Sequence, residues 1–319
     1  MSIVGDQHRL TVGYVHRHRP RQANVGIGVI LLDIAQDFLL AHLKAEGLFR
    51  ELVAFKGGTA LRKLFAGHAG RFSTDLDFAI RGMDDDRETA ARLIAETAAG
   101  ELGPFRYAPH QRRGRWEIQV TTALGDVPFA IKLDVGPPCW LTPHERPSVE
   151  MEVHRVYGFP MPALPCMALE EVLAEKIARL ARRSTARDAY DLVWCAETSP
   201  HSQFDRAYVR RLATLKVWSD MHGLTPTWPK ALNAGVLDHV RWLDPRPADR
   251  WDDEQIGRLT QPPPTLADLD AKLRSHYAFI GNATPEERRW GGGESRDRGE
   301  VLRAVVALPD LAIPPSYLR

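Results

Sequence analysis

The fold of this chain is decided by FKGGTAL at residues 55–61 together with RFSTDLDF at residues 71–78. The apolar residues before the first stretch predict a short buried strand, which runs into two glycines and Thr59. Glycine has no Cβ, so the backbone there can approach a phosphate closely. A helix capped by Thr59 would offer free N–H groups to an anion. Gly57, Gly58 and Thr59 therefore predict a phosphate-binding turn.

The second stretch predicts a strand with two carboxylates on one face. Asp75 and Asp77 are alternate residues, and alternate side chains of a strand point the same way. The two carboxylates repel each other unless a cation lies between them, and Mg2+ is the usual cation beside a phosphate, with Mn2+ as an alternative. Both stretches together predict a site for an NTP and a divalent metal. A glycine turn before a charged edge strand is the alternative, but it does not explain two carboxylates on an otherwise apolar strand.

The combination resembles the nucleotidyltransferase superfamily, whose hallmark is Gly-Gly-Ser/Thr, a spacer and Asp-x-Asp. More narrowly it resembles the AbiEii/AbiGii-type nucleotidyltransferase toxins, which include the MenT-like toxins. Their hallmark often extends to Lys-Gly-Gly-Thr, here residues 56–59, and to Arg-x-Ser-x-Asp-hydrophobic-Asp-Phe, here residues 71–78. The resemblance implies a bacterial toxin with tRNA as the acceptor and arrested translation as the outcome. It also implies a cognate antitoxin, which would bind the toxin directly or modify Ser73.

Composition limits the class of protein. The chain has 319 residues and a formal net charge of +1, so contact with nucleic acid must come from local patches. Its three cysteines lie far apart and form no Cys-x-x-Cys pair, which fits reduced thiols in a cytoplasmic protein. We expect no signal peptide and no membrane span, because the most apolar stretch is short and ends at Asp33.

The order of elements predicts an α+β (mixed α/β) fold. Strand patterns dominate up to residue 157, and helical patterns follow from residue 168. We therefore expect a nucleotidyltransferase-type core with an N-terminal arm and helix over residues 1–160, built on a small mixed sheet flanked by helices. A mainly helical domain over residues 161–319 would complete the active site. The resemblance implies the same arrangement.

A third carboxylate ends the apolar strand predicted over residues 129–135. The superfamily usually places an acidic residue on such a later strand, where it deprotonates the attacking hydroxyl or completes the metal site. Asp134 is the candidate. The alternative is a residue that caps the turn into Gly136. Whether Asp134 or Asp188 is the general base stays open.

A second group of candidates lies on two predicted helices. Lys176 falls on an apolar helical stripe, where a lysine is costly unless it reaches water or meets an anion such as a triphosphate. Asp188 and Asp191 match the Arg-Asp-x-x-Asp-Leu element that follows Glu-Lys in AbiEii-type proteins. The alternatives are a helix-terminal charge beside a Thr185 cap for Asp188, and a salt bridge to Arg187 for Asp191.

The remaining candidates are nucleotide-binding and basic residues. Lys56 and Ser73 flank the two motifs and would face the triphosphate; a surface lysine and a turn serine are the alternatives. Basic residues beside Trp116 and on the helix of Lys176 suit an RNA backbone, although a solvated face is the usual role of such clusters. The predicted RNA-binding residues are Arg112, Arg113, Arg115, Arg179 and Arg183.

The sequence thus predicts a Mg2+-dependent nucleotidyltransferase toxin that transfers NMP from an NTP to a hydroxyl of RNA, most directly tRNA, and releases pyrophosphate. Two rivals are a nucleotidyltransferase acting on a small molecule or a protein, and a non-catalytic protein on this fold that binds RNA or a partner. The sequence does not distinguish which NTP, RNA or antitoxin is involved, nor the oligomeric state.

Overall fold

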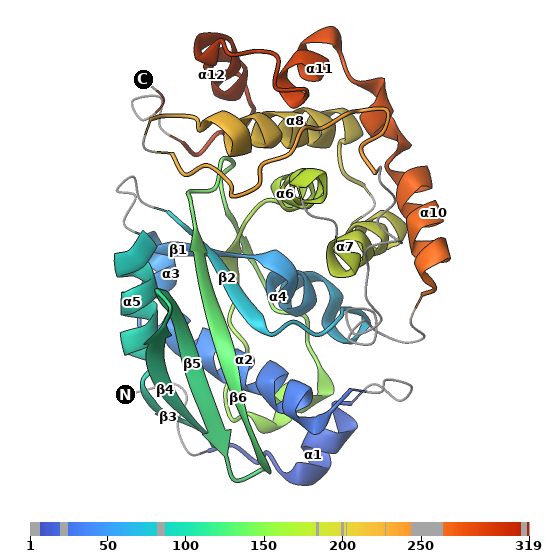
Figure 1. Ribbon diagram of the computed structural model, residues 1–319. Helices are drawn as coiled ribbons and strands as arrows, with labels where there is room; N and C mark the ends of the chain where they lie inside the picture. The colour runs from blue at the N-terminus through green and yellow to red at the C-terminus, as the bar shows by residue number, and fades with distance from the viewer. Residues whose placement is uncertain are drawn as a thin grey trace. The chain divides into compact units, whose positions relative to one another are not determined.

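The computed structural model describes residues 7–19, 25–81, 87–182, 185–198, 201, 203–226, 228–243, 264–313 and 318, with only the backbone of residues 126–128 (Figure 1). The chain forms two compact units. The first contains the described residues up to Pro138 and Pro143–Cys166; the second contains Cys139–Thr142 and the described residues from Met167 onward. No helix in the described ranges has the length and apolar character needed to cross a membrane.

The first unit is built on a mixed sheet, which confirms the predicted fold class. The described strands lie in the order β3-β4-β5-β6-β2-β1-β8-β7. Their bounds are β1 Val53–Lys56, β2 Asp75–Ile80, β3 Gly100–Leu102, β4 Phe105–Arg112, β5 Arg115–Thr122, β6 Gly125–Gly136, β7 His144–Arg146 and β8 Leu164–Cys166. β2 pairs antiparallel with β1 and parallel with β6, so the three strands that carry Lys56, Asp75, Asp77 and Asp134 are neighbours in the sheet.

Helices α2 and α5 pack against β4, β5 and β6. Ile118, Val120, Ile131 and Leu133 are buried on these strands, whereas the residues that alternate with them on β6, Lys132 and Asp134, are exposed. The buried hydroxyl of Tyr107 donates to the carbonyl of Ala35 on α2, at 2.7 Å. One face of this part of the sheet is therefore apolar and covered, and the other is polar and open. The helical elements of this unit are α1 Val12–Arg17, α2 Ile27–Ala45, α3 Leu48–Glu51, α4 Gly57–Leu61, a π-helix Arg62–Ala66, α5 Arg87–Ala98 and two 3-10 turns, Gly67–Ala69 and Glu152–Val156.

The second unit is helical, as expected for the C-terminal part of the chain. α6 packs against α8, and α7 against α10. The buried carboxylate of Glu171 on α6 accepts hydrogen bonds from the backbone N–H groups of Trp140 and Leu141, at 2.8 and 3.0 Å, and this ties Cys139–Thr142 to the helices. The described elements are α6 Leu169–Arg182, α7 Ala186–Glu197, α8 Arg206–His222, α10 Leu266–His276, the 3-10 turn Ala278–Asn282, α11 Pro285–Gly291 and α12 Arg298–Val306.

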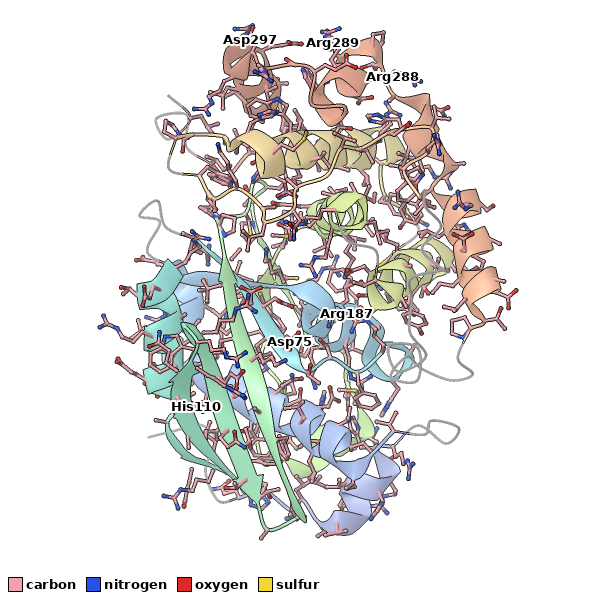
Figure 2. All side chains as sticks on the ribbon, in the orientation of Figure 1. Asp75, His110, Arg187, Arg288, Arg289 and Asp297 are labelled. Atoms are coloured by element: carbon pink, nitrogen blue, oxygen red, sulfur yellow. The ribbon has the colours of Figure 1, made fainter. Side chains whose placement is uncertain are left out.

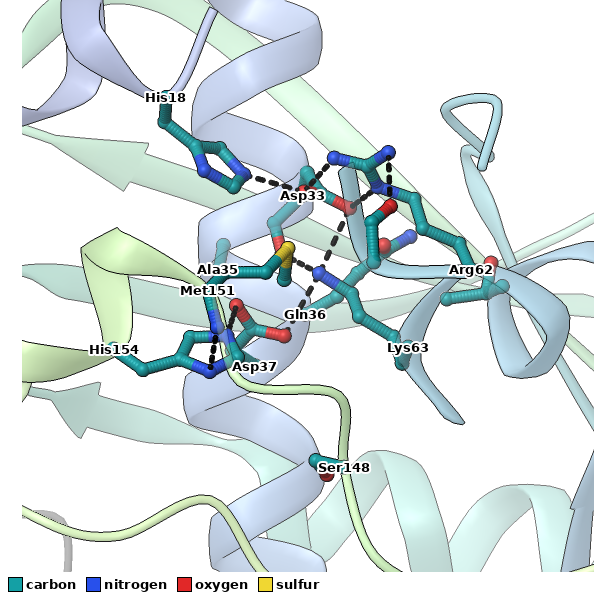
Figure 3. A network of polar contacts seen from close by, with 12 residues as sticks. His18, Asp33, Ala35, Gln36, Asp37, Arg62, Lys63, Ser148, Met151 and His154 are labelled. Atoms are coloured by element: carbon teal, nitrogen blue, oxygen red, sulfur yellow. Dashed lines mark hydrogen bonds and ion pairs between the residues drawn. The ribbon is translucent and has the colours of Figure 1, made fainter. Parts of the chain in front are cut away.

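A buried network of charges joins α2 to the π-helix that follows the glycine turn (Figure 3). Arg62 donates to both carboxylate oxygens of Asp33, from Nε at 2.8 Å and from Nη2 at 2.9 Å. Lys63 Nζ lies 2.7 Å from a carboxylate oxygen of Asp33 and 2.7 Å from one of Asp37. All four side chains are at most 1% exposed. Such pairs hold together because an unpaired charge at this depth is strongly unfavourable.

Two histidines complete the network from other segments. His18, just after α1, lies 2.8 Å from Asp33 through Nε2. His154 accepts a hydrogen bond from the backbone N–H of Met151 at Nδ1, and its Nε2 faces Asp37 at 3.5 Å. Burial alone would raise the pKa of Asp33, but the charges of Arg62 and Lys63 outweigh it and hold that pKa well below its ordinary value. The stability that this carboxylate contributes is therefore complete above the ordinary carboxyl pKa and is lost only as the pH falls below it.

The same network fixes the segment between the glycine turn and β2. Arg62 also donates to the carbonyls of Gly67 and Gly70, at 3.1 and 2.5 Å. The next residues along this segment are held by α2, because the buried amide of Gln36 donates to the carbonyl of Ser73 at 3.1 Å. The network therefore determines where the RFSTDLDF stretch enters the sheet.

We predict that Arg62→Met lowers the free energy of unfolding by about 3–5 kcal/mol, because it leaves a buried carboxylate without its partner. Arg62→Lys should recover only a small part of this loss, since lysine cannot donate two parallel hydrogen bonds to one carboxylate. Urea unfolding at pH 7 measures both. Arg92→Met is the control: its side chain on α5 is 57% exposed and its ion pair with Glu96 should contribute only about 0.3–0.5 kcal/mol. An unfolding midpoint of Arg62→Met equal to that of the wild type would contradict the role of the network.

Candidate active site

The sheet register brings three charged residues into one row. Lys56 on β1 is paired with Asp77 on β2, and Asp77 is paired with Asp134 on β6. Asp75 is paired with Lys132 in the neighbouring row. Because residues that face each other across strands project from the same side of a sheet, these five side chains share one face. The predicted carboxylates Asp75, Asp77 and Asp134 therefore come together, with a lysine at each side.

The glycine turn lies against this row. Gly57 has a φ of +80°, and a Cβ added to it would come within 2.0 Å of the Asp77 carboxylate oxygen Oδ2. A Cβ on Gly58 would lie 2.3 Å from the guanidinium of Arg71. Gly57 thus requires glycine for both conformation and space, whereas a side chain at position 58 would displace the guanidinium of Arg71. Arg71 was not among the predicted site residues, although it belongs to the quoted motif, and its side chain is buried beside the turn.

Thr59 does not cap the helix as predicted. α4 begins two residues earlier, at Gly57, and its N-cap residue Lys56 makes no side-chain cap. The Thr59 hydroxyl instead donates to the backbone carbonyl of Asp75, at 2.5 Å. This bond reaches from α4 to the first residue of β2, so Thr59 fixes the turn against the strand that carries the carboxylates. Sequence patterns could not reveal it, because the two residues meet only through the fold.

The donor set fits a divalent metal that arrives with a nucleotide. Asp75 and Asp77 are half-buried hard oxygen donors on one face, and Thr74 donates to Asp75 Oδ1 at 3.1 Å. Mg2+ is commonly held by one or two carboxylates together with substrate phosphates. Across the described residues, no group of three or more His, Cys, Asp or Glu side chains is arranged to enclose a metal by itself. The carboxylates therefore fit a metal whose remaining ligands come from the triphosphate and water.

The helical unit places its predicted residues in a second cluster. Lys176 Nζ lies 3.0 Å from Asp188 Oδ1 and 2.8 Å from Asp191 Oδ2, and all three side chains are buried. Lys176 is therefore not the lone lysine of an apolar stripe, as the sequence suggested, because two carboxylates from α7 meet it. Thr185 is the N-cap of α7 and accepts the backbone N–H of Asp188.

The environment of Asp188 makes it a weak base. Burial by itself would raise the pKa of Asp188, but the charges of Lys176 and Arg179 and a hydrogen bond from Thr185 outweigh burial and lower that pKa below its ordinary value. A general base works best when its pKa is near the working pH. This argument counts against Asp188 as the general base; the other candidate, Asp134, is exposed on the open face of β6.

The predicted RNA-binding residues fall in different places. Arg112 ends β4 and Arg115 begins β5, directly opposite each other, while Arg113 lies in the turn between them with a φ of 52°. Arg179 is on α6 with 41% of its side chain exposed. Arg183 lies outside the described residues.

Comparisons with known proteins place the chain among characterised families. Residues 38–283 match the family described as the nucleotidyl transferase AbiEii toxin of type IV toxin–antitoxin systems. Among solved structures, the chain is similar to MenT4, a nucleotidyltransferase toxin from Mycobacterium tuberculosis, with 32% identity, a TM-score of 0.76, and coverage of 94% of this chain and 99% of that one. JHP933 from Helicobacter pylori is 14% identical over 81% of this chain and 94% of that one, with a TM-score of 0.41, too low to carry an argument. No curated protein sequence matches the chain.

The family match spans most of the chain and contains the glycine turn, the carboxylate row and the Lys176 cluster. The similar MenT4 structure extends over nearly the whole of both chains. The chain belongs to the AbiEii family of nucleotidyltransferase toxins: it is a nucleotidyltransferase that uses an NTP and has an antitoxin as its partner.

Proposed function

We propose that this toxin transfers NMP from an NTP to a hydroxyl of an RNA acceptor in a Mg2+-dependent reaction that blocks translation in the cytoplasm. The proposed acceptor is tRNA. The observation that carries the proposal is the row of Lys56, Asp77 and Asp134 beside the Gly57 turn, in a chain of this family. Carboxylates in this row can bind the cation of a triphosphate. The neighbouring lysine and the glycine backbone can face its phosphate groups.

Each residue of the row has a chemical role in the proposal. A divalent metal held by Asp75 and Asp77 would neutralise charge on the triphosphate. Gly57 and Gly58 leave room for phosphate oxygens, and Lys56 reaches over Gly136, where an added Cβ would lie 3.0 Å from its Nζ. The ammonium of Lys56 thus stands beside the row and balances the charge of the leaving pyrophosphate. Asp134 accepts the proton of the attacking hydroxyl.

In this proposal, the cluster of Lys176, Asp188 and Asp191 supports nucleotide binding. Lys176, Asp188 and Asp191 match the second motif of the family, but their mutual ion pairs also stabilise the joint between α6 and α7. Asp188 and Asp191 hold Lys176 in one orientation, so a nucleotide that meets this lysine would meet a preorganised charge.

The experiment that tests the proposal uses the four NTPs, each labelled at the α-phosphate, with purified tRNA. We expect label to enter RNA from at least one NTP, only with Mg2+ or Mn2+ present. A parallel reaction contains cell lysate depleted of RNA. Label in a protein or a small molecule of that lysate, with none in tRNA, would show that the acceptor is not RNA and would favour the first rival, a nucleotidyltransferase acting on a small molecule or a protein. NTP binding without transfer to any acceptor would favour the non-catalytic rival.

Asp75→Asn and Asp77→Asn should each reduce transfer by at least about a thousand-fold, because a lost metal ligand removes several kcal/mol of transition-state stabilisation. The substitutions keep the size of the side chain, so the thermal unfolding midpoint should stay near that of the wild type. Initial rates at saturating NTP measure the effect. A folded Asp77→Asn protein with near-normal rates would rule out the proposed metal site.

Lys176→Met should destabilise the protein by about 3–5 kcal/mol, because it leaves Asp188 and Asp191 buried without their cation. The double variant Lys176→Met/Asp188→Asn should recover part of this loss, since it removes one unpaired charge. If the double variant regains stability but not transfer, Lys176 acts on the nucleotide. Recovery of both would leave Lys176 with a structural role alone. Urea unfolding and initial rates separate the two results.

Ser73→Glu should inhibit transfer strongly, because it adds negative charge two residues from Asp75, as a phosphate would with roughly two charges. Ser73 is buried, so Ser73→Gln is the matched control for size. Ser73→Gln and Ser73→Ala should retain more activity than Ser73→Glu at equal foldedness, judged by circular dichroism. Equal rates for Ser73→Glu and Ser73→Gln would exclude an electrostatic off-switch at this position.

A further inference from the structure

The open face of the sheet extends well beyond the carboxylate row. β4 and β5 form a long hairpin, and β5 pairs with β6, the strand of Asp134. Lys132 on β6 is paired with Asp75 on one side and with Glu117 on the other, and Glu117 is paired with His110 on β4. This row runs over four strands, about 14 Å from Asp75 to His110 at the usual strand spacing. Asp75 and His110 are labelled in Figure 2.

Cations at the outer end of this face are positioned by the alternation of the strands. Arg112 lies two residues beyond His110, and Arg115 two residues before Glu117, so both project from the same face as Lys132 and Asp75. All three cationic side chains, those of Arg112, Arg115 and Lys132, are exposed. The covered face of the same strands packs on α2 and α5, so these charges lie on the side that the helices leave open.

The register shows which charges neighbour these cations, and it places Lys132 between Asp75 and Glu117. His110 lies 3.6 Å from Glu117, so these two side chains are paired. Arg106, farther along β4, is directly opposite Glu101 on β3. The register places Arg112 opposite Arg115, and two like charges side by side are unfavourable unless an anion lies between them. Continued by two residues beyond the Glu117–Lys132 pair, the β5–β6 register brings Arg115 next to Asp134, so the two arginines stand at the end of the carboxylate row. The hairpin end therefore favours an anion beside the carboxylate row.

The character of the face indicates how such an anion is recognised. Trp116 projects from the opposite face, with Ile118 and Val120, so it cannot stack on a base held by the two arginines. The described side chains of β4, β5 and β6 that share the face of Arg112 include no tryptophan, tyrosine or phenylalanine. Binding to single strands that depends on base type relies largely on aromatic stacking, whereas lysine and arginine read the phosphate backbone.

We propose that Arg112 and Arg115 form a track for the phosphate backbone of the RNA acceptor, leading to the hydroxyl that Asp134 deprotonates. This inference rests on the proposed function and specifies how its acceptor is held. The track binds by charge alone, so its affinity depends on salt and not on base sequence.

The test measures binding of fluorescein-labelled single-stranded RNA of about ten nucleotides, by fluorescence anisotropy at a series of salt concentrations. Arg112→Gln/Arg115→Gln should weaken binding and lower the slope of log Kd against log salt by about 1.4, that is, about 0.7 for each lost phosphate contact. Oligo-U and oligo-A should lose affinity equally. Affinity for an NTP analogue should not change, because the variant leaves Lys56, the glycine turn and Asp77 intact.

The matched control is Arg50→Gln/Arg92→Gln, which removes the same charge from exposed arginines of α3 and α5. If the control weakens RNA binding as much as the hairpin variant, net charge explains the effect and the track is wrong. An unchanged slope for the hairpin variant also overturns it, while transfer of nucleotide to RNA by the wild type would leave the proposed function standing. A wild-type protein that neither binds RNA nor transfers nucleotide to it would contradict both the RNA track and the proposed function.

Discussion

The structure of the sheet unit depends on the buried pairing of Asp33 with Arg62 and Lys63. These charges come from α2 and from the π-helix that follows the glycine turn, and each is costly at this depth without the others. The pairing therefore specifies one position for the turn relative to α2. Through the carbonyls of Gly67 and Gly70 it also sets the path of the chain into β2, where the carboxylates stand. Residues remote from the chemistry thus position it.

The two faces of the sheet have different roles: one packs in the apolar core, and the other carries the charged residues of the candidate site. Apolar side chains such as Ile131 and Leu133 pack on the helices, while the residues that alternate with them, Lys132 and Asp134, face solvent beside β2. A strand period of two makes this separation automatic once the register is set. The register itself is set by burial, because a slip of one residue would turn Lys132 and Asp134 into the apolar layer. The catalytic geometry is therefore a consequence of core packing.

Local patterns predicted part of this structure. The same-face arrangement of Asp75 and Asp77 needs only strand alternation, and the helical character of the chain from residue 168 onward was predicted from its sequence pattern. Partners distant in sequence were not predicted. Asp33 was read only as the end of an apolar stretch, yet it is buried against Arg62, 29 residues later. Thr59 was read as a cap because its bond to Asp75 exists only after α4 and β2 meet.

The central claim is that Asp75 and Asp77 hold a divalent metal together with the nucleotide. It is tested most directly by calorimetric titration of a non-hydrolysable NTP analogue into the wild type and the Asp75→Asn/Asp77→Asn variant, with and without Mg2+. The account predicts that Mg2+ tightens binding to the wild type and has no such effect on the variant, because the donors of the metal site are gone. Equal enhancement by Mg2+ in both proteins would contradict it, since the metal would then be held elsewhere.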